Sequence, residues 1–87
     1  VGVGDATAQA EQVFRNLKSA LEGVGSDFSH LMKLNVFLTH REDIPKYRAV
    51  KAQYIPDEAA PVSTLILCAG LAEPDFLIEV EVIATIP

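Results

Sequence analysis

The chain has 87 residues, 49% of them hydrophobic and 22% charged, and its formal net charge at pH 7 is −5. This length indicates one domain, with a core small enough that an oligomeric partner is expected. Every apolar stretch is shorter than the roughly 20 residues needed to span a bilayer, and the chain does not start like a signal peptide. We therefore expect a cytoplasmic protein with no membrane partner.

The charges are unevenly distributed along the chain. All seven basic residues lie between Arg15 and Lys51, and the segment from Ala52 to Pro87 carries only acidic ones. Because nucleic-acid binding needs a basic surface, this balance argues against a nucleic-acid partner.

Cysteine and histidine are too sparse for a recognisable metal motif. Cys68 is the only cysteine, which excludes an internal disulfide and a cysteine-based zinc cluster. His30 and His40 flank one expected strand and lie too far apart in sequence for a local metal motif. We expect no metal and no other cofactor.

The first expected element is an amphipathic helix. Asp5 is a good N-cap, apolar residues then recur at spacings of three and four, and Gly25 supplies the stop. The apolar stripe consists of Ala10, Val13, Phe14, Leu17, Ala20, Leu21 and Val24. We expect Val13, Phe14, Leu17 and Leu21 to be buried against a sheet.

A strand and a second helix follow. Alternating apolar residues predict a largely buried strand from about Leu31 to Thr39. Asp43 and Pro45 mark the start of the helix, and Pro56 ends it. The expected buried stripe of this helix is Ile44, Tyr47, Val50 and Tyr54.

The last two expected strands are Val62 to Cys68 and Phe76 to Ile86, which together look like the wall of a small-molecule site. The order α-β-α-β-β predicts an α+β two-layer sandwich with two helices on one face of a sheet. Both faces of the last strand carry apolar residues, so we expect a partner subunit to cover the other face.

Four stretches that are dispersed along the chain carry a resemblance through their order and spacing: "AQAEQVFRNLKSALEGVGS", "LMKLNVFLTHREDIPKY", "APVSTLILCAGL" and "FLIEVEVIA". In these stretches the chain resembles the RidA/YjgF (L-PSP endoribonuclease-like) family, from Gly4 onward. The resemblance implies that residues 1–87 form one domain with a chorismate-mutase-like fold. It also implies a homotrimer that binds a small-molecule ligand in clefts between subunits.

The chain departs from the family in two places. It starts almost at the first helix, where family members have an N-terminal β segment that contributes site residues, so we expect that segment to be missing here. In the deaminase subgroup an arginine follows the proline of the "APVST"-like stretch, and that position is Val62 here.

The departure at Val62 bears on the family's best-known reaction, the hydrolysis of 2-imino or 2-enamino acids to 2-keto acids and ammonia. A guanidinium binds the substrate carboxylate through two parallel hydrogen bonds, and valine offers neither charge nor donor. We therefore expect an altered pocket, unless Lys33 or Arg41 of a neighbouring subunit supplies the cation.

The other candidate site residues come from the same resemblance. Glu79 stands where the family places an acid that holds the attacking water, and a carboxylate can take the proton of that water. Ser63 and Thr64 would supply hydroxyl groups to the ligand, and Cys68 its backbone N–H.

Plainer interpretations stand beside these. Glu79 and Glu81 share one strand face, which could simply be solvated, and Cys68 is more typical of a small apolar residue than of a nucleophile. For the function we expect imine or enamine deaminase-type hydrolysis. The alternatives are a non-enzymatic metabolite-binding, chaperone-like or regulatory trimer and, disfavoured by the charge, an endoribonuclease.

Overall fold

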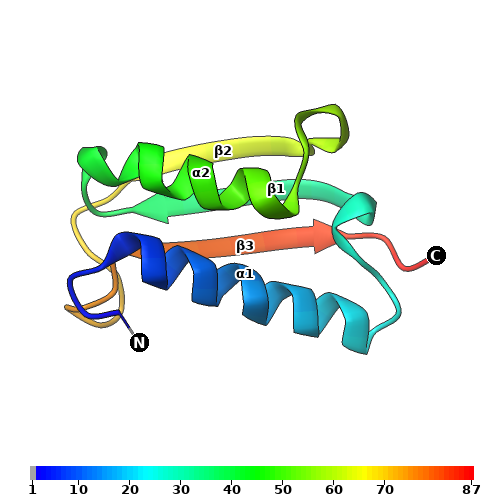
Figure 1. Ribbon diagram of the computed structural model, residues 1–87, viewed down its shortest axis with the longest axis horizontal. Coiled ribbons are helices and arrows are strands. Elements are labelled where there is room, and N and C mark those ends of the chain that lie inside the picture. The colour runs from blue at the N-terminus through cyan, green and yellow to red at the C-terminus, as the bar shows by residue number, and fades with distance from the viewer. Residues whose placement is uncertain (1) are drawn as a thin grey trace.

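The computed structural model describes residues 2–87, and its elements follow the order that the sequence predicts (Figure 1). There are two α-helices, α1 (Ala6–Gly23) and α2 (Ile44–Tyr54). The three strands are β1 (Leu31–Leu38), β2 (Val62–Leu67) and β3 (Ile78–Ala84). Single 3-10 turns occupy the connections at Phe28–His30, Arg41–Asp43 and Asp57–Ala59.

The three strands form one mixed sheet in the order β2-β1-β3. β1 and β2 are parallel because helix α2 carries the chain back between them, whereas β3 runs antiparallel to β1. The two strands expected to form the wall of a site therefore belong to one sheet but are not neighbours, since β1 lies between them.

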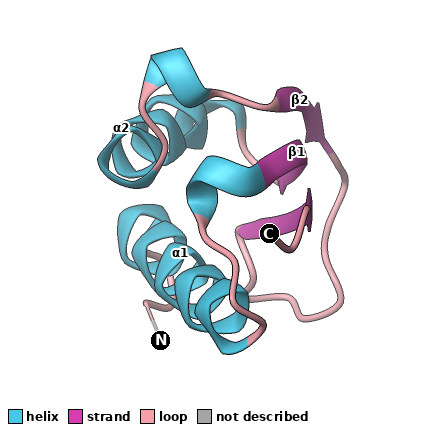
Figure 2. Cartoon of the chain, turned by 90° about the vertical axis from the view of Figure 1, so that its right-hand side faces the viewer, coloured by secondary structure: helices cyan, strands magenta, loops and turns pink. Residues whose placement is uncertain are grey.

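Both helices pack on the same side of the sheet, as Figure 2 shows. Leu34, Val36 and Leu38 of β1 are almost completely buried on that side. Their partners in register on the outer strands, such as Leu65 and Val80, pack against the same core. The α+β two-layer sandwich is thus confirmed.

The apolar stripe of α1 is buried only in part. The Asp5 carboxylate accepts a hydrogen bond from the Ala8 amide and caps the helix start. Of the residues expected to be buried, Phe14 and Leu21 are buried and Val13 and Leu17 are half-buried. Ala20 and Val24 of the same stripe are exposed. Val24 follows the last helical turn, and Ala20 faces the outer edge of β3, beside which the described residues place no further strand.

β3 is shorter than the strand expected from Phe76 to Ile86. The partner strand β1 has eight residues, and the outermost pairs are Leu38 with Ile78 and Leu31 with Ala84. Beyond these pairs the ladder continues only as single hydrogen bonds, from the Thr39 amide to the Leu77 carbonyl and from the Thr85 amide to the His30 carbonyl, so the strand ends there.

An aromatic cluster fills the core between the two helices. The ring of Phe14 lies 5.3 Å from that of Tyr54, 6.2 Å from Tyr47 and 6.1 Å from Phe28, measured between centroids. Tyr47 is 3% exposed, and its hydroxyl finds no hydrogen-bond partner among residues 2–87. Burial raises the pKa of Tyr47 to about 12.

This buried hydroxyl leads to a prediction for Tyr47→Phe. Because the hydroxyl is unpaired, its removal should leave the free energy of unfolding at pH 7 within about 1 kcal/mol of wild type or raise it. In the wild type, the raised pKa contributes stability that is complete below pH 10 and lost as the pH rises toward 12. Urea melts from pH 7 to 11 should show this alkaline loss to be smaller in the variant. An equal loss in both proteins would contradict the prediction.

Candidate functional site

The sheet face that points away from the helices carries most of the candidate residues, and we call it the open face. In register, its three rows are Val62, Lys33 and Ile83; then Thr64, Asn35 and Glu81; then Ile66, Phe37 and Glu79. Several of its apolar side chains are exposed in the single chain, with Val62 at 72% and Ile83 at 58%. Such a face is typical of a surface that is covered in an assembly.

The sequence-predicted residues of β2 do not all share this face. Val62 and Thr64 lie on the open face, whereas Ser63 pairs with Leu34 and belongs to the helix side. All three are exposed. Ser63 and Thr64 therefore cannot both donate hydroxyl groups to one ligand on one face of this strand.

Glu79 lies on the open face, at the opposite corner from Val62. The two residues are separated by the width of β1 and by four positions along the strands, so with ~4.8 Å between strands and ~3.3 Å per residue they are roughly 16 Å apart. A small substrate cannot touch both within one chain.

Beside Glu79, the chain surface is hollowed into a groove between α1 and the outer edge of β3. Its volume is about 370 Å³, and Glu79 is the only ionisable side chain along it in the described part of the chain. The groove is lined by Val13, Asn16, Leu17, Ala20, Phe76, Ile78, Glu79 and Val80. Sequence reasoning missed this groove, although Val13 and Leu17, at the flank of the helical stripe, were a signal for it.

Cys68 follows β2 directly and continues its pairing with β1. Its amide donates a hydrogen bond to the Leu38 carbonyl at 2.9 Å, and its thiol sulfur lies 3.6 Å from the same oxygen. The backbone donor expected for a ligand is already in use here. The role toward a ligand expected for the Cys68 amide stays a prediction, one that requires this bond to be shared or broken.

The open face also holds polar residues that the structure brings together. The side-chain amide of Asn35 on β1 donates a hydrogen bond to a carboxylate oxygen of Glu81 on β3, at 3.0 Å. Lys33 is adjacent to Val62 in the parallel register and lines a small hollow of about 160 Å³ with Asn35 and Glu81. Lys33 is therefore the basic residue next in register to Val62 on the open face.

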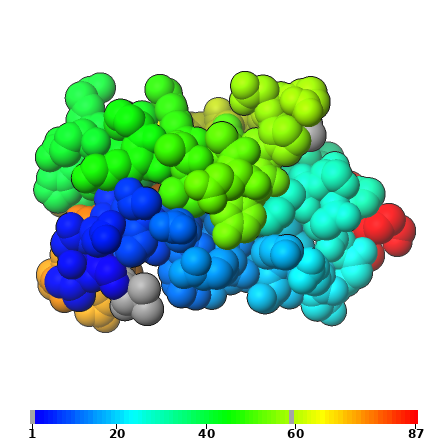
Figure 3. All heavy atoms as spheres, viewed as in Figure 1, coloured from blue at the N-terminus to red at the C-terminus, as the bar shows by residue number. Residues whose placement is uncertain are grey.

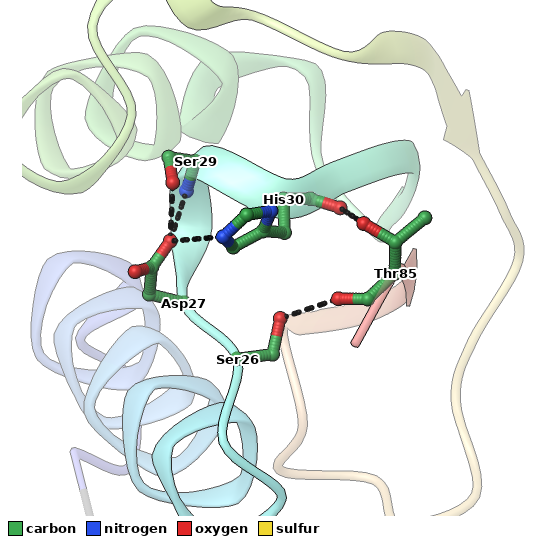
Figure 4. Close-up of polar contacts among 5 residues, drawn as sticks. All are labelled: Ser26, Asp27, Ser29, His30 and Thr85. Atoms are coloured by element: carbon green, nitrogen blue, oxygen red, sulfur yellow. Dashed lines mark hydrogen bonds and ion pairs between the residues drawn. The ribbon is translucent and has the colours of Figure 1, made fainter. Parts of the chain in front are cut away.

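Asp27, Ser29 and His30 are gathered in one turn before β1 (Figure 4). The Ser29 hydroxyl and amide donate to the Asp27 carboxylate, and these two bonds lower the pKa of Asp27 below its ordinary value. His30 lies 4.0 Å from Asp27. Because the serine bonds to the carboxylate and not to the histidine, this turn is a helix cap and not a nucleophile–base pair.

Within residues 2–87, no three histidine, cysteine or acidic side chains gather in a way that could hold a metal ion. Over the same residues, neither helix has the length and apolar character needed to cross a membrane.

The family model described as Endoribonuclease L-PSP matches residues 1–86. The chain belongs to this family. A curated member, a RutC family protein from Synechocystis sp., is 31% identical over all 87 residues of the chain, which cover 66% of that protein. The 3-aminoacrylate deaminase RutC of Acinetobacter baylyi is 33% identical, with 97% of the chain and 65% of that protein covered.

Solved structures agree with this membership of the L-PSP family. An uncharacterised protein from Pseudomonas aeruginosa superposes with a TM-score of 0.91 at 30% identity, covering all of this chain and 75% of that one. A YjgF-family protein from Mycobacterium tuberculosis has a TM-score of 0.87 at 23% identity, covering 94% and 69%. The chorismate-mutase-like fold is thereby confirmed. The chain spans about two thirds of the length of the curated relatives it matches.

Proposed function

We propose that this chain belongs to a homotrimeric hydrolase that deaminates small imines or enamines in clefts between subunits. The observation that carries the proposal is the position of Glu79, an exposed carboxylate on the open face, in register with the apolar residues Phe37 and Ile66. The likeness to a 3-aminoacrylate deaminase supports the same reaction class. Because Val62 and Glu79 are roughly 16 Å apart in one chain, a cleft that uses both must take them from different subunits.

In this mechanism the Glu79 carboxylate orients a water molecule and accepts its proton as the oxygen adds to the imine carbon. The resulting tetrahedral adduct carries a hydroxyl and an amino group on one carbon. Return of the proton from Glu79 to nitrogen makes ammonia the leaving group. As the C–N bond breaks, the hydroxyl proton passes to the Glu79 carboxylate and a carbonyl compound is left. No cofactor is needed, because the reaction is a hydrolysis without net electron transfer.

The alternative proposal is a trimer that binds a carbonyl metabolite without turning it over. It is favoured by Val62, which gives a substrate carboxylate no donor at a position that is 72% exposed. An endoribonuclease is disfavoured because Lys33 is the only basic residue in the three rows of the open face.

The cheapest test generates 2-aminoacrylate in situ with a dehydratase and measures its decay and the formation of pyruvate. Deaminase-type activity predicts decay faster than in buffer and sensitive to Glu79→Gln. Equal decay with and without protein would favour the binding alternative. The variant provides the control, because the amide keeps the shape of the carboxylate but cannot accept the proton of water.

Assembly is a separate prediction. The exposed apolar residues of the open face should be covered by neighbouring copies, so multi-angle light scattering should give three times the mass of the chain at micromolar concentration. Ile83→Lys, on the open face, should weaken the trimer by placing a like charge near every copy of Lys33. A stable wild-type monomer would contradict the assembly.

A further inference from the structure

Gln9 is a nearly buried polar residue, 8% exposed, that no step of the proposed reaction uses. It lies in the first turns of α1, and each of its three hydrogen bonds goes to a backbone atom outside that helix. Its Nε2 donates to the Asp75 carbonyl at 2.9 Å and to the Gly2 carbonyl at 3.0 Å. Its Oε1 accepts from the Leu77 amide at 2.8 Å.

These bonds hold the connection between β2 and β3 against the start of α1. The blue start of the chain and the orange segment before β3 lie side by side in Figures 1 and 3. The connection runs over residues 68–77, and its far end is held by the hydrogen bond from the Cys68 amide to the Leu38 carbonyl. At the end near β3, Leu77 is also held by the Thr39 amide, which donates to the Leu77 carbonyl. This bond, at 3.3 Å, is longer than the 2.8 Å bond from the Leu77 amide to Gln9.

Glu79 lies only two residues beyond Leu77, at the second position of β3. β3 is an edge strand in the described residues, and a single pair, Leu38 with Ile78, separates Glu79 from the connection. Strand ends fray when their hydrogen bonds are lost. Loss of the hydrogen bond at Leu77 would therefore make the backbone of Glu79 more mobile.

We propose that Gln9 is a positioning residue for Glu79: by fixing residues 75–77 on α1, it sets the start of β3 and the groove beside it. A carboxylate that holds water for attack must be placed within a fraction of an ångström. Gln9 does so from a helix, without touching the ligand. This role rests on the proposed hydrolysis for its effect on rate, but its effect on Glu79 can be measured without any turnover.

The test compares Gln9→Leu, which removes all three bonds at similar volume, with Gln53→Leu, the same change at an exposed position of α2. Amide exchange at Leu77 should become at least tenfold faster in Gln9→Leu, while Val36 at the centre of β1 keeps its protection. The carboxyl ¹³C signal of Glu79 should also move. Gln53→Leu should change neither. An unchanged Glu79 signal together with an unprotected Leu77 would overturn the inference.

A second variant keeps the inference testable if Gln9→Leu folds poorly. Gln9→Glu retains the acceptor for the Leu77 amide but, when ionised, loses the two donors. Exchange at Leu77 should stay slow. Exchange at the Phe76 amide, which donates to the Glu73 carbonyl within the connection, should speed up, and the Glu79 signal should stay near its wild-type position. A Glu79 signal displaced by this variant while Leu77 remains protected would overturn the positioning role of the Leu77 bond.

Hydrolysis of 2-aminoacrylate supplies the readout that depends on the proposed function. In whichever form of the protein is active, Gln9→Leu should lower kcat about tenfold or more, with a much smaller change in KM. If no form of the protein is active, the proposed function fails, and the exchange and ¹³C measurements still decide the role of Gln9. An unchanged kcat in an active protein whose Leu77 amide has opened would overturn that role.

Discussion

Val62→Arg should raise the hydrolysis of 2-aminoacrylate above that of the wild type. The new guanidinium would give the substrate carboxylate a planar cation with two parallel donors. By analogy with buried charge pairs, such a contact is worth ~2–5 kcal/mol, which corresponds to roughly 30-fold to several thousand-fold in rate. Since Val62 is 72% exposed, the substitution should not disturb the fold. Steady-state rates with 2-aminoacrylate made in situ provide the measurement.

Two controls make this experiment specific. Ser63→Arg places the same side chain one residue later, on the opposite face of β2, and should give no gain. Glu79→Gln in the Val62→Arg background should remove the gain. If the carboxylate acts as a general base, the hydrolysis rate should fall by about a hundredfold. A gain from Ser63→Arg instead would place the ligand on the helix side of the strand and contradict the open-face site.

A strongly active wild type would point to a different cation. Lys33 is next to Val62 in the register of the sheet and could reach the same carboxylate. In that case Lys33→Met should abolish the activity, whereas Arg41→Met would test the other basic candidate. Activity that survives both changes would show that the carboxylate needs no cation from these positions.

Phe14→Ala should have the largest effect on stability. Phe14 is fully buried and is in aromatic contact with residues of α2 and of the turn before β1. Truncating a buried phenylalanine costs about 3–5 kcal/mol, a large part of the ~5–15 kcal/mol that a domain has in total. Urea melts should therefore show a large drop in midpoint or a chain that is unfolded in buffer.

The matched control is Val24→Ala, in the same helical stripe of the sequence. Val24 is 55% exposed, so its truncation should cost less than about 0.5 kcal/mol. A loss below about 1 kcal/mol for Phe14→Ala would mean that the aromatic cluster does not organise the core.

Local patterns in the sequence predict the elements of this fold, but not the neighbours of each strand. The spacing of apolar residues places α1 and α2, and the alternation around Val36 places β1, because these signals depend on nearby residues. The order β2-β1-β3 depends on pairing between distant segments. The exposure of Ala20 likewise depends on how far the sheet extends beside α1, which no local pattern encodes.

The candidate site was predictable to a smaller extent. Alternation puts Glu79 and Glu81 on one face, and the same rule separates Ser63 from Val62 and Thr64. Nothing in the local sequence indicates that the Cys68 amide donates a hydrogen bond to the Leu38 carbonyl. Gln9 gave no signal either, because its partners Asp75 and Leu77 lie 66 and 68 residues away.

A small carbonyl or imine compound should bind on the open face beside Glu79, in a cleft completed by another copy of the chain. Chemical-shift mapping tests it most directly, with pyruvate and a neutral ketone titrated into the assembled, isotope-labelled protein. We expect saturable shifts at Glu79 and on the open-face side of β2, at Val62 and Thr64, which disappear when Ile83→Lys disrupts the trimer. Shifts confined to Val13, Leu17 and Phe76 in the groove, or shifts that persist in a monomer, would contradict it.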